Sequence, residues 1–385
     1  MSAASEEEAK YLAPVYAQMP FEPISGEGPW LKLDDGRRLL DFYGGHAVAG
    51  LGYGHAGLLG NIKRQVDLLL FQSNASALRI RAEAARRLLG FTSTPFAKLF
   101  FTNSGAEANE NALRLAIRTT GRKKIVAIEG GFHGRTAAAA AASHGATRKW
   151  YGFPQTPFPV SFVPRNDQAA LERVLDANTA AVIVEPVQGL AGAIDLHRGF
   201  LHAMRAATQA AGTMLIFDEV QCGMGRTGFP FAADMYEVCP DLLTTAKSLG
   251  GGFPCGALFM SEAVASGVQL GDLGSTFGGG PVACAAMIAV VEAIESEDLL
   301  TSVRDLSENL RQRCLLGPVR DIQGAGFLLG LRTTRPAKDV KGELLNRGIL
   351  VGGSTDPFVI RLLPPLNIQT EHVDLLVEAL GELAP

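Results

Sequence analysis

The segment TMLIFDEVQCGMGRTG, residues 213–228, places two acidic residues directly after a continuous apolar run. Such a run is typical of a strand that is buried on both faces of a mostly parallel sheet. Asp218 then stands at the end of that strand, where burial disfavours a charged carboxylate unless a cationic group accompanies it. The glycines that follow favour tight turns. The segment therefore predicts an α/β sheet that presents an acid at a strand end.

Similar apolar and β-branched runs recur along the middle of the chain. The predicted strands are KLFFT (98–102), KIVAI (124–128), AAVIVEP (180–186), LLTTA (242–246) and ALFMS (257–261). Segments with helical spacing separate them, including 106–119, which follows good capping residues, and 281–296. This alternation indicates a large α/β domain.

The pattern changes towards both ends of the chain. Residues 30–42, WLKLDDGRRLLDF, predict two strands joined by a turn at 34–36. The tail predicts helices over 298–314 and 371–383 and strands at 327–331 and 358–363, which suggests a smaller α+β unit. With 385 residues, the chain exceeds the roughly 250 to 300 residues of a single core. We expect residues 51–290 to form the large domain, with 1–50 and 291–385 forming the smaller one.

Composition narrows the possible partners. The formal net charge is −4 and the basic residues are scattered, so we expect no nucleic-acid or membrane partner. The five cysteines show no CxxC spacing, which argues against disulfides and a zinc site, and we expect no metal. The first residues, MSAASEEEAK, do not look like a signal peptide, and no apolar run approaches 18 residues. A cytoplasmic protein with small-molecule partners is expected.

The turn after KLFFT contains Ser104, Gly105 and Ala106 and leads into a predicted helix. Glycine permits close backbone approach, and the free N–H groups of a helix N-terminus bind anions. The turn therefore fits a phosphate group, although an ordinary serine N-cap beside a glycine would look the same.

The turn after KIVAI is rich in glycine and contains Phe132 and Arg135. An aromatic ring can stack on a flat cofactor, and a guanidinium can bind a carboxylate through two hydrogen bonds. A core phenylalanine and a surface arginine explain the same two residues equally well.

Lys247 follows LLTTA and is soon followed by Gly250, Gly251 and Gly252. A lysine in this position is commonly a solvated loop residue, but a desolvated lysine has a lowered pKa and can form a Schiff base. Asp218 would keep its charge beside a protonated ring nitrogen. Taken together, the acid, the lysine, the aromatic residue and the phosphate turn are what pyridoxal 5′-phosphate (PLP) requires of a protein.

Six motifs, in this order, resemble those of the class III (subgroup II, ornithine-type) aminotransferases of PLP fold type I: NSGAEANENALRLA, FHGRT, VEPVQG, FDEVQCGMGRTG, TTAKSLGGGFPCGA and STFGGGPVACAA. The resemblance extends from DFYGGHAVAGLGYGH to RLLPPLNI and is strongest to the acetylornithine aminotransferases. It implies a large domain with a mostly parallel seven-stranded sheet covered by helices, and a smaller α+β domain built from both termini.

The resemblance implies roles for the matching residues around the cofactor ring. Lys247 would form the Schiff base and carry the proton of the 1,3-prototropic shift, and Asp218 would pair with the pyridine nitrogen. Val220 and Phe132 would lie on the two faces of the ring, and Gln221 would lie near its phenolic oxygen.

The resemblance also implies how the phosphate is bound. Ser104, Gly105 and Ala106 would contact the phosphate, while Thr276 would reach the phosphate of the neighbouring subunit. The active site would then be shared across a homodimer. Ser275, beside Thr276, is expected to contact substrate.

Two arginines resemble the carboxylate-binding residues of the family. Arg135 would bind a carboxylate near the entrance, and Arg361 would bind the α-carboxylate of glutamate or 2-oxoglutarate. Two anion sites suit a ping-pong reaction in which donor and acceptor use one pocket. The implied reaction moves the δ-amino group of N2-acetylornithine to 2-oxoglutarate, as in arginine biosynthesis, giving N-acetylglutamate semialdehyde and glutamate.

The sequence departs from the family pattern at four positions. Leu190 replaces the glutamate of the usual QGEGG, so Arg361 would lack a compensating acid when no substrate is bound. Leu273 and Gly280 replace common histidine and asparagine residues. His46 lies in a segment that resembles part of the substrate entrance, where it is either a packing residue or a substrate contact.

These departures leave the amino donor open. N2-Succinylornithine, ornithine, 4-aminobutyrate and carrier-linked lysine are alternatives to N2-acetylornithine. A non-catalytic relative of the same fold is disfavoured, because Lys247, Asp218, Gln221 and Thr276 are all present.

Overall fold

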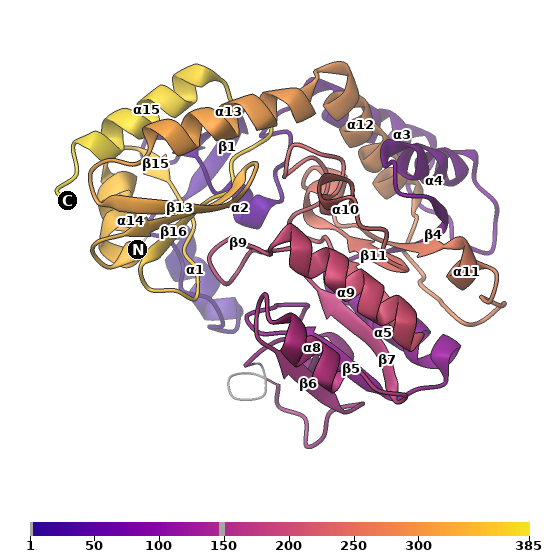
Figure 1. The fold of residues 1–385 in the computed structure, drawn as a ribbon. Helices are drawn as coiled ribbons and strands as arrows, with labels where there is room; N and C mark the ends of the chain where they lie inside the picture. The colour runs from indigo at the N-terminus through magenta and orange to yellow at the C-terminus, as the bar shows by residue number, and fades with distance from the viewer. Residues whose placement is uncertain (1–2, 146–150) are drawn as a thin grey trace.

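A seven-stranded sheet forms the centre of the larger part of the molecule (Figure 1). The computed structural model describes residues 3–145 and 151–385. From one edge to the other, the strands are β4 (Phe96–Thr102), β12 (Gly256–Ser261), β11 (Leu242–Thr245), β10 (Met214–Asp218), β7 (Thr179–Val184), β5 (Lys124–Ile128) and β6 (Val160–Val163). Only β12 runs antiparallel to its neighbours within this sheet. The predicted mostly parallel α/β sheet is confirmed.

The sequence pattern missed one strand of this sheet. β6 is the four-residue segment VSFV, and it follows the proline-rich stretch TPFP. Proline neighbours and short length obscure a strand signal in the sequence. β6 is recognisable only because it pairs in parallel with β5 at the edge of the sheet.

Successive side chains of the central strand β10 point to opposite faces of the sheet, and both faces are covered. Leu215 and Phe217 belong to the core that includes residues of α9 (Arg198–Ala211), whereas Ile216 belongs to the core that includes residues of α5 (Gly105–Thr120). This alternation is the normal geometry of a strand. Because both faces are buried, the sequence of β10 is continuously apolar until Asp218.

Both ends of the chain contribute to the smaller part of the molecule, at the left of Figure 1. One sheet has the order β1 (Pro23–Glu27), β2 (Trp30–Leu33), β3 (Arg38–Asp41) and β15 (Ile349–Leu350), and another has the order β13 (Val319–Ala325), β14 (Leu328–Thr333) and β16 (Val359–Leu362). β15 pairs in parallel with β3, so the tail completes a sheet begun by the first residues. This pairing supports our proposal that 1–50 and 291–385 form one domain beside 51–290.

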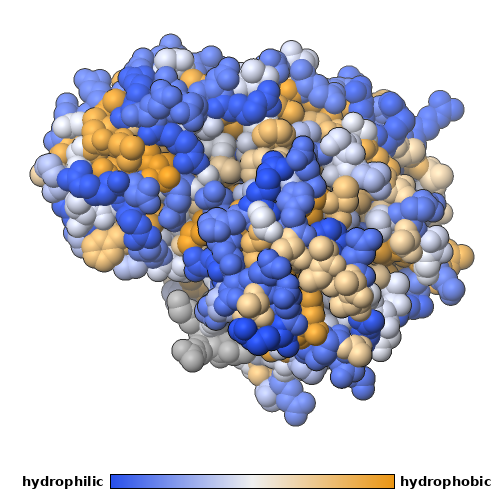
Figure 2. Space-filling model, in the orientation of Figure 1, coloured by the Kyte–Doolittle hydropathy of each residue, from blue (hydrophilic) through white to orange (hydrophobic). Residues whose placement is uncertain are grey.

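The remaining elements are mostly helices. They are α1 (Ala3–Tyr11), α2 (Gly44–Ala47), α3 (Ala56–Leu68), α4 (Arg79–Phe91), α6 (Ala137–Ala141), α8 (Gln168–Val174), α10 (Ala232–Tyr236), the 3₁₀ helix η1 (Lys247–Gly250), α11 (Glu262–Ala265), α12 (Pro281–Ser296), α13 (Leu299–Arg313), α14 (Ala337–Asn346), α15 (Thr370–Gly381) and the two-stranded pair β8 (Val187–Gln188) and β9 (Ile194–Asp195). In residues 3–145 and 151–385, no helix combines the length and apolar character needed to cross a membrane. The face shown in Figure 2 is mixed, with a compact apolar area at the upper left, over the smaller part of the molecule, and further apolar atoms among hydrophilic ones over the larger part.

The glycine-rich loop after β10 joins the two parts of the molecule. Arg226 is fully buried, and its Nη1 donates a hydrogen bond to the carbonyl of Pro364, three residues beyond Arg361. The N–H of Phe327 donates to the carbonyl of Arg226 at 2.8 Å, and Arg304 Nη1 donates to the carbonyl of Gly228 at 2.6 Å. The loop therefore fixes the C-terminal segment against the strand end that presents Asp218.

Glu219, the second acid of the opening segment, has a structural position. It is fully buried and accepts hydrogen bonds from the N–H groups of Ala232 and Ala233, at 2.5 and 2.8 Å, at the start of α10. Burial, only partly offset by these two hydrogen bonds, raises the pKa of Glu219 to about 8. Its side chain holds the loop to α10.

The Glu219→Gln substitution should change how stability depends on pH. A carboxyl group with a raised pKa in the folded state stabilises the fold below its unfolded pKa, and this contribution is lost as the pH rises through the folded pKa. Between about pH 5 and about pH 8, the wild-type free energy of unfolding should fall relative to that of the variant, by up to about 1.4 kcal/mol per pH unit. Denaturant unfolding at several pH values measures this difference. Parallel pH profiles would contradict the assignment.

Candidate active site

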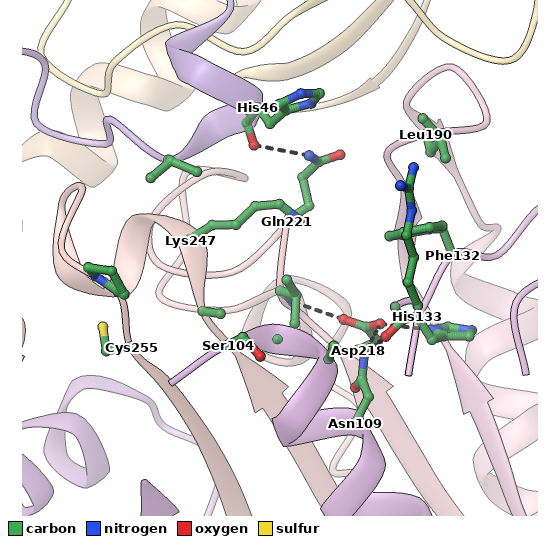
Figure 3. A pocket seen from close by; sticks show the side chains of 18 of the residues that line it. His46, Ser104, Asn109, Phe132, His133, Leu190, Asp218, Gln221, Lys247 and Cys255 are labelled. Carbon is green, nitrogen blue, oxygen red and sulfur yellow. Dashed lines mark hydrogen bonds and ion pairs between the residues drawn. The ribbon is translucent and has the colours of Figure 1, made fainter. Parts of the chain in front are cut away.

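A cavity of about 620 Å³ lies at the end of β10, between the large sheet and the C-terminal strands (Figure 3). Ten of the residues predicted from the sequence line it: Ser104, Gly105, Ala106, Phe132, Arg135, Asp218, Val220, Gln221, Lys247 and Arg361. They come from segments spread over more than 250 positions of the chain. The fold therefore gathers most of the predicted site residues around one cavity.

Asp218 lies at the inner end of this cavity and is 2 % exposed. Its Oδ1 accepts a hydrogen bond from the N–H of Val220 at 3.0 Å, and its Oδ2 accepts one from Asn109 Nδ2 at 2.7 Å. His133 Nδ1 lies 2.7 Å from the same Oδ2 (Figure 3). Three polar groups therefore contact the carboxylate from three segments of the chain. Together they fix the orientation of the Asp218 side chain.

Asn109 and His133 were not assigned roles from the sequence. Asn109 is one turn into α5, and its Oδ1 accepts a hydrogen bond from Thr244 at 2.6 Å while its amide binds Asp218. His133 lies in the FHGRT motif, and its side chain is fully buried. One feature of the sequence could have indicated Asn109. It follows Gly105 by four residues, and this spacing places both residues on one face of a helix.

Lys247 extends into the middle of the cavity from the first residue of η1 (Figure 3). Its backbone has φ of +49°, a left-handed conformation that is uncommon for residues other than glycine. Backbone strain of this kind concentrates at functional sites. Burial, opposed by the nearby charge of Asp218, lowers the pKa of Lys247. A lowered pKa makes a lysine amine a better nucleophile and proton acceptor.

The N-terminus of α5 forms another wall of the cavity. Ser104 is the N-cap, and its Oγ accepts the N–H of Glu107 at 3.2 Å, so the serine does have the ordinary capping role. The cavity is also lined by Gly105 and Ala106, at the helix end where N–H groups favour an anion. A Cβ added to Gly105 would lie 2.6 Å from Cγ1 of Val220. Glycine is therefore required for Val220 to keep its place beside this helix end.

Glu185 is a cavity residue that had no assigned role. Its Oε1 accepts the N–H of Phe132 at 2.8 Å, and its Oε2 accepts the N–H of Gly189 at 3.3 Å. Burial, together with the charge of Asp218, raises the pKa of Glu185. The carboxyl group connects the loop of Phe132 with the loop that contains Leu190.

Arg361 and Leu190 lie at the other end of the cavity, with His46 and Gln221. Arg361 is 2 % exposed, and its Nε donates to the carbonyl of Gly353 at 2.5 Å. Its Nη1 donates to Oε1 of Gln221 at 3.3 Å. Gln221 Nε2 donates to the carbonyl of His46 at 3.2 Å (Figure 3). Gln221 therefore contacts one segment from the first 50 residues and one from the C-terminal part of the chain.

His46 belongs to a left-handed turn, because residues 44–47 all have positive φ angles, including +67° at His46 itself. Its ring packs against Tyr43 at a centroid distance of 4.7 Å, and the Tyr43 hydroxyl lies 2.7 Å from His46 Nε2. The side chain is exposed and lines the cavity. It is both packed on Tyr43 and open to a ligand.

Ser275 and Thr276 do not line the cavity of the single chain. Ser275 Oγ accepts hydrogen bonds from Asn103 Nδ2 at 3.2 Å and from the N–H of Gly278 at 2.9 Å. Thr276 is exposed on the same loop. Their predicted roles, like those of the cavity residues, stay predictions.

The cavity fits PLP. The buried carboxylate of Asp218 suits a protonated ring nitrogen, and the N-terminus of α5 suits a phosphate. Val220 is held between Gly105 and Asp218 by close packing and by its N–H. The amine of Lys247 lines the same space. These residues supply the charges and surfaces that the cofactor needs.

Comparisons of the sequence with known proteins agree with this chemistry. The profile of the family described as Aminotransferase class-III matches residues 11–383. An acetylornithine aminotransferase of Streptomyces coelicolor is 43% identical over 93% of this chain and 89% of its own length. One of Methanocaldococcus jannaschii is 37% identical over 98% and 96%, respectively.

Solved structures resemble the whole chain. The ornithine aminotransferase of Toxoplasma gondii, in which PLP partially occupies the active site, has a TM-score of 0.91 and 28% identity, covering 99% of this chain and 94% of that protein. The acetylornithine aminotransferase of Elizabethkingia anophelis has a TM-score of 0.88 and 30% identity, covering 98% and 97%. The fold is that of the PLP fold type I aminotransferases.

The close packing of Gly105 and Val220 allows a direct test of whether PLP binds beside the N-terminus of α5. Gly105→Ala should push Val220 out of place and weaken PLP binding by about tenfold or more, measured as the dissociation constant of the cofactor. Gly90→Ala is the matched control, because a Cβ there meets nothing within 4 Å. Equal PLP affinity in both variants would show that PLP does not bind beside the N-terminus of α5 and Val220.

Proposed function

Since the chain belongs to the class-III aminotransferases, we propose that it transfers the δ-amino group of N2-acetylornithine to 2-oxoglutarate, forming N-acetylglutamate semialdehyde and glutamate. The protein is a PLP-dependent aminotransferase. The observation that supports the substrate most strongly is the presence of two arginines, Arg135 and Arg361, in the same cavity as Lys247 and Asp218. The curated relatives named acetylornithine aminotransferases support the choice of donor.

The reacting end of the cavity would be organised by two residues. When bound, PLP supplies an aldehyde and a ring that withdraws electrons from the substrate carbon. Asp218 would hold a proton on the pyridine nitrogen through its fixed carboxylate. Lys247 would bind the aldehyde through Nζ in the resting enzyme, and the same Nζ would later take and return the substrate proton, a role suited to its lowered pKa.

The other residues would position the cofactor and the two substrates. Phe132 and Val220 would contact the two ring faces, and Ser104, Gly105 and Ala106 would contact the phosphate. Arg135, exposed at the edge of the cavity, would bind the carboxylate distant from the reacting carbon. Arg361 would bind the carboxylate attached to the reacting carbon.

The proposed substrate pair can be tested by screening amino donors with 2-oxoglutarate. Donors to be compared are N2-acetylornithine, N2-succinylornithine, ornithine, 4-aminobutyrate and lysine linked to a carrier. Nitrogen-15 placed on the δ-amine should appear in glutamate, with the highest kcat/KM for N2-acetylornithine. A preference for a donor without an N2-acyl group would refute the proposed substrate while leaving the aminotransferase activity intact.

We also propose that the enzyme is a homodimer with shared active sites. Leu68, Leu70, Phe71 and Phe277, called here the dimer patch, are between 41% and 72% exposed. Phe71 and Phe277 pack together at a centroid distance of 5.2 Å, and Asn74 Nδ2 donates to the carbonyl of Ser275 at 2.8 Å. An apolar surface of this kind is typical of an interface, and Thr276 lies directly beside Phe277. A second copy on this patch would bring Thr276 to the neighbouring cavity.

Lys247→Ala should lose the visible absorbance of the lysine-bound cofactor, because no other amine takes the place of Nζ. Steady-state turnover should fall by at least about 10⁴-fold, as expected when covalent catalysis and proton transfer are both removed. The measurements are an absorbance spectrum of the purified variant and glutamate formation. Full turnover without Lys247 would rule out its assigned role.

The Leu70→Glu and Phe277→Glu double variant should be monomeric, because charges replace apolar side chains in the dimer patch. Light scattering measures the molecular mass of the variant. The affinity for PLP should also decrease, because a monomer has no second copy to bring Thr276 to its cavity. Leu375→Glu is a control on α15, where Leu375 is 41% exposed. A dimer that persists in the double variant would place the interface elsewhere.

A further inference from the structure

The structure shows two hydrogen bonds from the guanidinium of Arg361, and both go to neutral acceptors. These are the carbonyl of Gly353 and the side-chain amide of Gln221. Within residues 3–145 and 151–385, no carboxylate lies within ion-pair distance of Arg361. A buried cation with neutral partners keeps its full charge, at a cost in free energy that an arriving anion relieves.

The surroundings of Arg361 do not supply the missing negative charge. Leu190 is apolar, and the loop that contains it is tied to this end of the cavity because Thr355 N–H donates to the carbonyl of Leu190 at 3.0 Å. Glu185 is the acid whose charge acts on Arg361, but its oxygens accept the backbone N–H groups of Phe132 and Gly189 and make no ion pair with the guanidinium. Lys341 adds a second cation, and its Nζ lies 3.2 Å from the position of a Cβ on Gly353.

The position of Gln221 depends on a glycine. A Cβ added to Gly189 would lie 1.6 Å from Oε1 and 2.7 Å from Cδ of Gln221, so the amide occupies the space of a side chain at position 189. Gln221 Nε2 is held by the carbonyl of His46 at 3.2 Å. The amide is therefore fixed between Gly189 and His46, with its oxygen turned towards Arg361.

We propose that Gln221 is a specificity-determining residue: its amide holds Arg361 in place without neutralising the positive charge of the guanidinium. The absence of a side chain at Gly189 leaves the space that this amide occupies. Arg361 then faces the cavity with an uncompensated charge in both halves of the reaction. The inference rests on the proposed function, in which Arg361 binds the carboxylate next to the reacting carbon.

Two consequences for the substrates follow. Dicarboxylates that place one carboxylate at Arg361 gain from pairing a buried charge, because no protein acid has to be displaced first. N2-Acetylornithine has no carboxylate on its reacting carbon, so it gains nothing from this charge. A negative charge introduced at position 221 should therefore weaken the first class of ligand selectively.

Equilibrium binding of unreactive ligands to the holoenzyme tests this directly. Glutarate represents the dicarboxylates, and N2-acetylnorvaline represents the donor without its δ-amine. In Gln221→Glu, calorimetry should show glutarate bound at least about tenfold more weakly, while N2-acetylnorvaline changes by less than about threefold. Equal weakening of both ligands would overturn the proposal, since it would mean that Gln221 acts only through the cofactor. Unchanged glutarate binding would overturn it as well.

A double-mutant cycle tests the part played by Gly189. Gly189→Ala should alter glutarate affinity by about fivefold or more in the wild-type background, because the methyl group displaces the amide. In the Gln221→Ala background, the same change should be less than about twofold, because no amide remains to be displaced. Equal effects in the two backgrounds would contradict the coupling.

Controls separate this proposal from the proposed function. Gln209→Glu makes the same chemical change at an exposed position on α9 and should leave both affinities unchanged. Retained cofactor absorbance shows that a variant is folded and loaded. If the wild-type enzyme binds glutarate but prefers a donor other than N2-acetylornithine, the donor assignment fails while the role of Gln221 is still tested by glutarate.

Discussion

A buried carboxylate at the end of a central strand is the constraint on which the rest of the site depends. Asp218 keeps its position because Asn109, His133 and the N–H of Val220 all bind it. Those groups come from α5, from the loop after β5 and from the loop that directly follows β10. Each group must be in place for the carboxylate to be correctly oriented, so the geometry of the cavity depends on the arrangement of the large sheet.

The other end of the cavity is supplied by segments near the two ends of the chain, which contain His46 and Arg361. The loop after β10 begins at the strand end of Asp218 and, through Arg226, binds the segment that follows Arg361. Glu219 secures the same loop to α10. The motif DEVQCGMGRTG therefore has two structural positions: its first residue, Asp218, lines the cavity, and its Arg226 and Gly228 form hydrogen bonds with the C-terminal part of the chain.

Much of the fold and part of the site could be predicted from the sequence. Continuous apolar runs identify β10 and its neighbours because both faces of the sheet are buried, whereas β6 gives too short a signal beside its prolines. Glycines and charged residues at strand ends pointed to Gly105, Asp218 and Lys247. The roles of Asn109 and Glu185 were not predictable in this way, because they depend on contacts between segments far apart in the chain. The neutral contact between Gln221 and Arg361 likewise became visible only in three dimensions.

We propose that the carboxylate of Asp218 keeps a proton on the pyridine nitrogen of PLP. Nitrogen-15 NMR of holoenzyme reconstituted with ring-labelled PLP measures that protonation state directly. We expect a protonated nitrogen throughout the neutral pH range in the wild-type enzyme and an unprotonated nitrogen in Asp218→Asn, with the cofactor still bound. An unprotonated nitrogen in the wild-type enzyme, or a protonated one in both proteins, would contradict it.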